Sequence, residues 1–226
     1  MASSGGSGGS RGERRGGSRL EESLEARARR AFRGLPVLET ARLRLRPLRP
    51  EDAEEMHAYA SDPEVARHML WGPHGSPRET RNFLRYVRER YSRGDPAAWG
   101  LEERETGRFI GTCGVQSWHP EHARAELGYV LARERWGRGL MTEAVAAAVG
   151  FGFDGLGFNR LEARCLEGNA ASARVLEKVG MTHEGTSRAS HLVAGSFRDL
   201  RHYAMLRDDP RLGDPALQSH QAPDAH

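Results

Sequence analysis

The sequence predicts a mixed α/β fold in which helices flank a central sheet. Strand-like and helix-like segments follow one another in the order β–α–α–β–β–β–α–β–α–β–β, which is typical of a three-layer domain. Residues 41–46 alternate strictly between apolar and charged side chains, the period of a half-buried strand. Residues 140–153 repeat apolar side chains every three or four positions, the period of a helix packed on a core.

The first half of the chain contributes one strand and two helices. After the strand at residues 41–46, Pro50 begins a helix with acidic residues in its first turn, where proline and negative charge are favoured. Ser76 and Glu79 form a capping box around Pro77, which predicts the start of the next helix. The buried face of this helix is expected to carry Thr80, Phe83, Leu84, Val87 and Tyr91.

The second half alternates strands with two further helices, the first at residues 140–153. Asn169 is placed to cap the second helix, and Gly180 stands where a left-handed residue would end it. The strands after the first are expected at residues 99–103, 109–117, 125–131, 160–166, 182–189 and 200–206.

The composition indicates one folded domain with two polar extensions. The chain has 226 residues, of which 38% are hydrophobic, and residues 1–17 consist largely of glycine, serine and arginine. Such a segment cannot bury a core. We therefore expect a disordered basic arm at residues 1–35, the domain at residues 36–208 and a disordered tail at residues 209–226. A short charged helix at residues 20–32 is an alternative within the arm.

The charge is distributed unevenly along the chain. The formal net charge is +3, whereas residues 1–35 alone carry +4, so the positive balance belongs to the arm. We interpret the arm as a solvated extension, with nucleic-acid binding as the alternative. The chain has no apolar run long enough to cross a membrane and no secretory leader, which predicts a cytoplasmic protein.

The cysteines and histidines do not predict a disulfide or a metal site. Cys113 and Cys165 each fall within a predicted strand, so we expect buried, reduced thiols. His119 and His122 lie three residues apart in a turn, but zinc would require further ligands at suitable spacing. We therefore expect no bound metal.

A glycine-containing loop joins a strand to a helix. Its sequence is Arg135-Trp136-Gly137-Arg138-Gly139-Leu140-Met141. The two glycines allow the backbone to turn tightly and to bring its N–H groups close to a ligand. The helix start adds unpaired N–H donors and the positive end of the helix dipole. The combination predicts a binding site for a phosphate or pyrophosphate group.

Other interpretations of the loop fit the sequence less well. A P-loop needs a lysine after its last glycine, but the single lysine of the chain is Lys178. A dinucleotide-binding loop needs a third glycine, where this chain has Thr142, although Glu162 lies at a suitable distance for its acidic residue. A tight turn with solvated arginines is the third alternative.

Three blocks in order resemble the GNAT acyltransferases, in particular the RimJ/RimL-like branch. They are the strand at residues 125–131, the string W-G-R-G-L-M-T-E-A at residues 136–144, and the segment at residues 168–181 that reads G-N-A-A-S-A-R-V-L-E-K-V-G-M. The resemblance spans roughly residues 40–208. It implies a GNAT-type three-layer fold, whose mostly antiparallel central sheet splays beside the strand at residues 160–166 and binds acetyl-CoA in the opening.

The resemblance implies how the cofactor would be held. The loop at residues 135–141 would bind the pyrophosphate through its backbone N–H groups. Backbone groups of Val130 and Leu131 would pair with the pantetheine arm, and one N–H would polarise the acetyl carbonyl. Glu134 replaces the glutamine or arginine usual at the first motif position, where Arg133 or Arg135 would substitute.

The resemblance also implies candidate catalytic residues. Glu126 is the candidate base, and an ion pair with Arg124 or Arg164 is the alternative role for its carboxylate. Ser172 and Asn169 would face the sulfur and the pantetheine amide, although Asn169 has the alternative role of a helix cap. The candidate catalytic residues are Glu126, Ser172 and Asn169. The candidate cofactor-binding residues are Val130, Leu131, Arg135, Trp136, Gly137, Arg138, Gly139, Leu140, Met141, Asn169 and Ser172.

The predicted function is that of an acetyl-CoA-dependent N-acetyltransferase. The acetyl group would pass by direct attack on the thioester to a primary amine, either a protein N-terminal α-amine, for example of a ribosomal protein, or a small-molecule amine. Residues 71–74 would either border the acceptor pocket or form a loop that packs Trp71 on the core, and Tyr129 would either bind the substrate or pack on the sheet. Leu176 stands where many GNAT enzymes have a tyrosine acid, so a non-catalytic acyl-CoA-binding regulatory module is the alternative. The expected partners are acetyl-CoA and the acceptor, with neither membrane nor metal, and a homodimer is left open.

Overall fold

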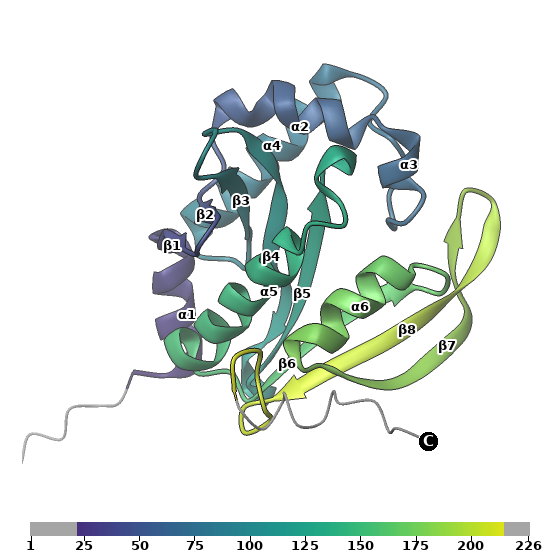
Figure 1. Cartoon of the computed structure of the whole chain (residues 1–226). Helices are drawn as coiled ribbons and strands as arrows, with labels where there is room; N and C mark the ends of the chain where they lie inside the picture. The colour runs from purple at the N-terminus through teal and green to yellow at the C-terminus, as the bar shows by residue number, and fades with distance from the viewer. Residues whose placement is uncertain (1–21, 215–226) are drawn as a thin grey trace, which may run out of the picture.

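The computed structural model describes residues 22–214, and its mixed α/β architecture confirms the predicted fold class (Figure 1). Eight strands form one sheet in the order β1-β2-β3-β4-β5-β6-β8-β7. Neighbouring strands are antiparallel except β5 and β6, which are parallel. The strands are β1 (Leu38–Glu39), β2 (Leu43–Arg46), β3 (Ala98–Glu103), β4 (Phe109–His119), β5 (Arg124–Leu131), β6 (Arg160–Leu166), β7 (Thr182–Val193) and β8 (Ser196–Leu206).

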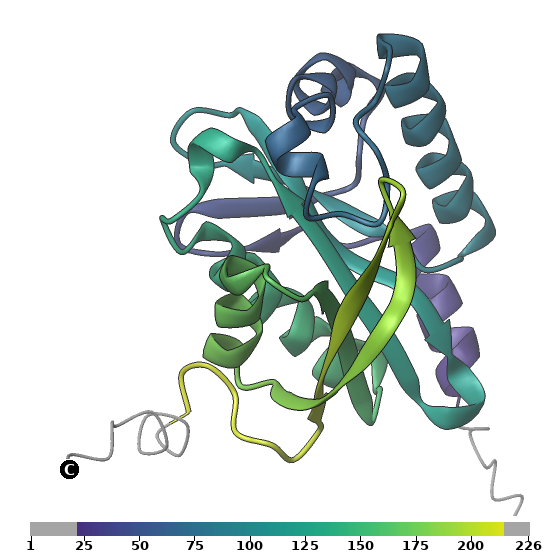
Figure 2. The same cartoon turned by 90° about the vertical axis from the view of Figure 1, so that its right-hand side faces the viewer.

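Helices cover both faces of the sheet. Figure 2 shows α1 and α4 on one side of it and α5 and α6 on the other. Large side chains such as Trp99, Phe158 and Leu161 are fully buried between these layers. The α-helices are α1 (Leu24–Arg33), α2 (Ala53–Ala60), α3 (Pro63–Ala66), α4 (Pro77–Arg93), α5 (Leu140–Gly150) and α6 (Ala170–Val179).

The predicted helix caps are confirmed for α4 and α6. Ser76 accepts from the N–H of Glu79, as predicted, whereas the Glu79 carboxylate accepts from Gly75 rather than from Ser76, so only the Ser76 half of the capping box forms. A left-handed glycine at Gly94 ends this helix. Asn169 accepts from the backbone N–H of Ser172 at 3.1 Å, and Gly180 ends α6 with a φ of +103°. Polar side chains thus satisfy the otherwise unpaired N–H groups at the starts of both helices.

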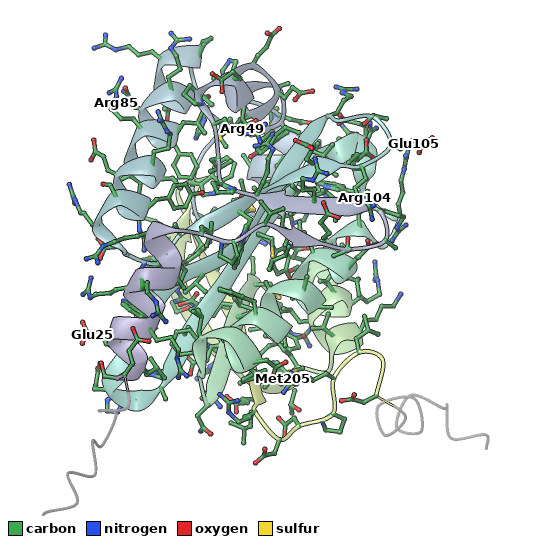
Figure 3. All side chains as sticks on the ribbon, turned by 90° about the vertical axis from the view of Figure 1, so that its left-hand side faces the viewer. Glu25, Arg49, Arg85, Arg104, Glu105 and Met205 are labelled. Carbon is green, nitrogen blue, oxygen red and sulfur yellow. The ribbon has the colours of Figure 1, made fainter. Side chains whose placement is uncertain are left out.

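The expectation of a disordered arm is wrong for residues 24–33, which form α1. Ala28 and Phe32 have no exposed surface, and the Phe32 ring packs edge-on against Trp118 with 5.8 Å between ring centroids. The outer side of α1 is charged and carries Glu25 (Figure 3). Apolar residues four apart made this helix amphipathic, and burial of that stripe attaches it to the domain. Residues 1–21 of the expected arm lie outside the described part of the chain.

The helix predicted at residues 140–153 changes its form near its end. The α-helix stops at Gly150, and residues 151–156 continue as a wider π-helical turn that ends at Gly157 with a φ of +87°. A Cβ on Gly152 would crowd Leu161, and one on Gly155 would crowd the Phe151 ring. Glycine at these positions therefore lets the turn pack closely on the sheet.

The described part of the expected C-terminal tail rests on the domain. The N–H of Leu212 donates to the carbonyl of Val179 at 3.3 Å, and Arg211 pairs with Asp154 at 2.8 Å. Residues 215–226 lie outside the described part. In the described residues, no helix combines the length and the apolar character that a membrane span requires.

Candidate active site

The ladder between β5 and β6 is short and opens into a gap. Its parallel register runs from the Arg124–Arg160 pair to the Leu127–Ala163 pair. Beyond that point β5 continues to Leu131 along β4, while β6 continues along β8. A cavity of about 510 Å³ occupies this region, lined by both strands, the glycine loop and α6. Beyond Leu127, the main-chain N–H and C=O groups of β5 that face β6 have no partner strand. They are available to form hydrogen bonds with an extended ligand.

The glycine loop lies at one side of the same cavity. Gly137 and Gly139 both have a left-handed φ of +74°, which other residues adopt only with strain. The first helical bond of α5 runs from the N–H of Glu143 to the carbonyl of Gly139, so the amides before it have no helical acceptor. Of residues 135–141, all except Arg138 line the cavity. This geometry fits a pyrophosphate group.

The β4–β5 ladder decides which main-chain groups of β5 face the gap. The N–H of Ala132 donates to the carbonyl of Ile110 at 2.8 Å, and such bonded pairs recur at every second residue. The polar groups of Val130 therefore point towards β4, and those of Leu131 towards the gap. The Leu131 carbonyl there accepts from Trp136 Nε1 at 2.8 Å. Of the two expected backbone contacts, the register supports Leu131 and directs Val130 elsewhere.

Glu126 lines the cavity and forms a two-point ion pair with Arg164. The distances are 2.7 Å from Nε to Oε1 and 3.1 Å from Nη2 to Oε2. Of the two partners considered for Glu126, Arg124 instead pairs with Glu162 at 3.3 Å. Glu126 and Arg164 also line a second hollow of about 670 Å³ over β5, β6 and the β7–β8 hairpin. Glu126 therefore lies between the two spaces.

Ser172 lies at the cavity wall with a tyrosine hydroxyl beside it. The hydroxyl oxygens of Tyr129 and Ser172 are 2.8 Å apart. Burial raises the pKa of Tyr129 well above its ordinary value of 10, so the phenol stays protonated and can donate to Ser172 Oγ. Asn169 is confirmed as the cap of α6 and also lines the cavity. Leu176 is fully buried in the core and contributes no acid.

Part of the cavity wall is mainly apolar. Val65, Met69, Leu70 and Trp71, from α3 and the segment after it, line the cavity. The ring of His74 lies 5.5 Å from that of Trp71, and its Nδ1 is 2.9 Å from the buried Thr80 hydroxyl. This hydrogen bond fixes the segment onto α4, so Trp71 is held at the cavity.

The acids at the start of α2 do not reach the cavity. Asp52 is buried in an ion pair with Arg46 at 2.7 Å, and Glu55 pairs with Arg108 at 3.3 Å. Of the described residues that line the cavity, Glu126 alone carries a carboxylate. The cations that line it are Arg135, Arg164, Arg174 and Lys178. The cavity is therefore poor in negative charge.

Arg135, predicted to bind the cofactor, and His68, which was not predicted, both line the cavity. Arg135 Nε lies 2.8 Å from Glu103 Oε1, so its guanidinium is tied to β3. His68 lines the cavity, and burial lowers its pKa below 6.5, with the charge of Arg67 as a smaller cause. Its Nε2 accepts from Arg67 Nε at 3.1 Å, so the ring is neutral near pH 7. A single histidine in an irregular segment carries no sequence signal for such a position.

The two cysteines form no disulfide, and Cys165 lies in the cavity wall. Cys113 and Cys165 are confirmed as buried free thiols, and burial raises the pKa of Cys113 to about 12. His119 and His122 lie 3.4 and 3.8 Å from Glu121 on the surface. Across residues 22–214, no three histidine, cysteine or acidic side chains gather as metal ligands would.

The chain is similar in sequence to known acetyltransferases. Residues 42–182 match the family model described as Acetyltransferase (GNAT) domain. The chain is 32% identical to an uncharacterised N-acetyltransferase, p20, of Bacillus licheniformis, over 76% of this chain and 97% of the relative. It is 27% identical to the [Ribosomal protein uS5]-alanine N-acetyltransferase of Escherichia coli, over 72% and 86% of the two chains.

A solved structure shares the fold. RimL, a ribosomal L7/L12 α-N-protein acetyltransferase crystallised in complex with coenzyme A, superposes with a TM-score of 0.69 at 21% identity, over 76% of this chain and 99% of that one. The splayed strands, the glycine loop and the family match agree with one another. The chain belongs to the GNAT acetyltransferases and has ribosomal-protein N-acetyltransferases among its relatives.

Proposed function

We propose that this acetyltransferase uses acetyl-CoA to acetylate a primary amine by direct attack on the thioester. The observation that carries the proposal is that the glycine loop and the gap between β5 and β6 open into one cavity. The glycine loop can bind an anion, and the open edge of β5 can pair with an extended chain of amide groups. Acetyl-CoA has both features, a pyrophosphate and a pantetheine arm with amide groups. The coenzyme A complex of RimL supports this choice of donor.

Bound acetyl-CoA supplies an activated acetyl thioester, and the main chain of the protein holds and polarises it. The N–H groups of residues 137–141 bind the pyrophosphate at the start of α5. The N–H of Leu131, which the register turns to the gap, donates to the acetyl carbonyl. Side-chain identity at residue 131 therefore matters little for this contact.

Glu126 accepts the proton of the attacking amine, directly or through one water molecule. Its ion pair with Arg164 keeps the carboxylate in place beside the gap. An α-amine has a pKa of about 8, against about 10.4 for lysine, so only a modest base is needed near neutral pH. This difference favours an N-terminal amine as the acceptor.

Ser172 protonates the departing sulfur. As the new C–N bond forms and the C–S bond breaks, the amine proton passes to Glu126 and the Ser172 hydroxyl proton to the sulfur; transfer of the Glu126 proton through water then restores the Ser172 hydroxyl. Tyr129 donates to Ser172 Oγ at 2.8 Å and stabilises that oxygen when its proton leaves. The Ser172–Tyr129 pair thus replaces the tyrosine acid whose position is taken here by Leu176.

The acceptor is best matched by the N-terminal amine of a polypeptide. Polyamines and aminoglycosides carry several positive charges, whereas Glu126 is the one carboxylate among the described residues of the cavity wall and is already paired. The apolar side chains of Leu70 and Trp71 suit an uncharged first residue. The relation to the uS5-alanine N-acetyltransferase supports the same class of acceptor.

The experiment is a calorimetric titration with acetyl-CoA followed by an amine panel. The panel contains peptides with alanine, serine or lysine first, together with spermidine and an aminoglycoside. We expect micromolar binding and preferred acetylation of the alanine and serine peptides. No binding of acetyl-CoA would refute the proposal. Binding without turnover of any amine would instead favour the non-catalytic acyl-CoA-binding module.

A further inference from the structure

We propose that Arg42 is a positioning residue for the pyrophosphate loop and that it acts together with Thr40 and Glu143. This inference rests on the proposed use of acetyl-CoA. The three residues form a clamp, the Thr40–Arg42–Glu143 clamp, which connects the β1–β2 turn to the first turn of α5. The clamp orients the loop backbone for an anionic ligand without touching that ligand.

The carboxylate of Glu143 receives three hydrogen bonds from the β1–β2 turn. Its Oε1 accepts from Thr40 Oγ1 at 2.5 Å and from the N–H of Arg42 at 2.8 Å. Its Oε2 accepts from Arg42 Nε at 2.7 Å. The Glu143 side chain is only 17% exposed. Short bonds to a charged acceptor are the stronger class of hydrogen bond, so the first turn of α5 is firmly attached to β2.

Arg42 also holds the loop itself. Its Nη1 donates to the carbonyl of Arg138 at 2.8 Å. That carbonyl belongs to the same planar trans peptide as the N–H of Gly139, so the two groups point in opposite directions. Fixing the carbonyl on Arg42 turns the Gly139 N–H away from it. Gly139 lines the cavity, whereas Arg138 does not. The contact thus selects the peptide orientation that a bound phosphate needs.

The clamp also neutralises a negative charge beside the expected anion site. Glu143 lies in the first turn of a helix whose positive end is expected to receive an anion, and an isolated carboxylate there would repel a phosphate. The guanidinium of Arg42, 2.7 Å from Glu143 Oε2, neutralises this charge. Loss of Arg42 would therefore both release the Arg138 carbonyl and expose the negative charge.

The β1–β2 turn is held from its other side by Arg104. Arg104 Nη1 donates to the Thr40 carbonyl at 2.6 Å, and the Arg104 N–H donates to the Arg42 carbonyl at 3.0 Å. Figure 3 shows Arg104 beside this turn. The clamp is thus built on the edge of the sheet. The clamp explains why the polar β1–β2 turn, nearly one hundred residues before the glycine loop, lies against that loop.

The test compares Arg42→Ala with Arg44→Ala. Arg44, two residues further along, pairs with Glu39 and Glu102 and makes no contact with Glu143 or the Arg138 carbonyl, so Arg44→Ala is the matched control. We expect Arg42→Ala to raise the calorimetric Kd for acetyl-CoA about tenfold, and Arg44→Ala to leave it within about twofold. Binding of pantetheine, which lacks the phosphates, is followed by NMR titration and should not change in either variant.

Two further measurements separate positioning from general stability. Arg42→Lys keeps the charge but removes the fork that reaches both partners, so it should recover less than half of the lost binding free energy. Hydrogen exchange of the Glu143 amide, which donates to the Gly139 carbonyl at 3.1 Å, should become faster in Arg42→Ala, while the β4 amides stay protected. An unchanged Kd for acetyl-CoA, or an equal loss for acetyl-CoA and pantetheine, would overturn the inference. Failure of the wild type to bind acetyl-CoA would instead refute the proposed function.

Discussion

The two walls of the cavity are made of different parts of the protein. On one wall, the glycine loop, the start of α5 and the end of β5 present main-chain groups. On the other, α3 and the segment after it present apolar side chains, including Leu70 and Trp71. The first wall requires a backbone conformation, which glycines and caps encode locally. The second requires only suitable side chains on a segment held in place by distant contacts.

This difference explains what each wall can recognise. Backbone N–H donors at the start of a helix suit a ligand that does not vary, such as the acetyl donor. Substitutions of side chains leave these N–H donors in place. An apolar wall of side chains can change with the acceptor without altering the fold. We therefore expect substitutions in the glycine loop to abolish binding of acetyl-CoA. Substitutions of Ser172 and Glu126 should slow turnover while acetyl-CoA binding is kept.

The largest effect is expected for Gly137→Glu. Gly137 has a φ of +74°, and a carboxylate there would be both strained and repulsive towards a pyrophosphate. We expect acetyl-CoA binding to weaken more than about 100-fold, as measured by calorimetry. Gly107→Glu is the control, because Gly107 has a φ of +69°, equally open space and a position in the β3–β4 turn. Equal loss of binding in both variants would show that strain alone, and not the anion site, is responsible.

The backbone wall could be predicted from the sequence because its signals are local. Gly137, Gly139 and the Asn169 cap each specify a conformation at their own position, and all three adopt it. The attachment of α1 was not predicted, because its short apolar stripe of Ala28 and Phe32 competes with many charges and gains stability only by packing on Trp118. The clamp around Glu143 depends on a turn about one hundred residues away, which no local pattern reveals.

The next largest effect is expected for Ser172→Ala. If the serine hydroxyl protonates the sulfur, kcat should fall about 100-fold while the Kd for acetyl-CoA changes little. The α6 cap survives in this variant, because Asn169 accepts from the backbone N–H of residue 172. Tyr129→Phe removes only the supporting donor 2.8 Å away and should lower kcat less. Wild-type turnover in Ser172→Ala would contradict the assigned role.

A smaller, pH-dependent effect is expected for Glu126→Gln. With a peptide acceptor at pH 7, kcat/KM should fall about tenfold, because most of the amine is then protonated and needs a base. Above the pKa of an α-amine, about 8, the acceptor is already neutral and hydroxide is more abundant, so the deficit of the variant should be smaller at pH 9 than at pH 7. A deficit that is the same at both pH values would assign Glu126 to the ion pair with Arg164 alone.

The sequence predicted the position of Glu126 but not its surroundings. Its place on a splayed strand was implied by the resemblance of the block around it, whereas its pairing with Arg164 rather than Arg124 depends on strand register. Trp71 lies at the cavity, as the resemblance implied, whereas His68 was not predicted and reaches the cavity because Thr80 holds this irregular segment in place. Such tertiary placement, unlike a cap or a left-handed glycine, has no sequence signature of its own.

The smallest effect concerns the stability contributed by Glu143. Burial alone would raise the pKa of this carboxyl, but the hydrogen bonds from Thr40 and Arg42 outweigh it and lower the pKa below 4.5. A lowered folded-state pKa means that the charged form stabilises the fold above the ordinary value, and that this contribution is lost as the pH falls through the folded value. Because Arg42 is half exposed, the contribution should be about 1 kcal/mol.

Urea unfolding of Glu143→Gln at pH 7 and pH 4 measures this contribution. The variant should be less stable than the wild type at pH 7, and the difference should shrink at pH 4. Glu105→Gln is the control, because Glu105 is an exposed residue of the β3–β4 turn (Figure 3). A constant difference at both pH values would mean that the charge of Glu143 does not stabilise the fold, and that its clamp acts on the orientation of the loop alone.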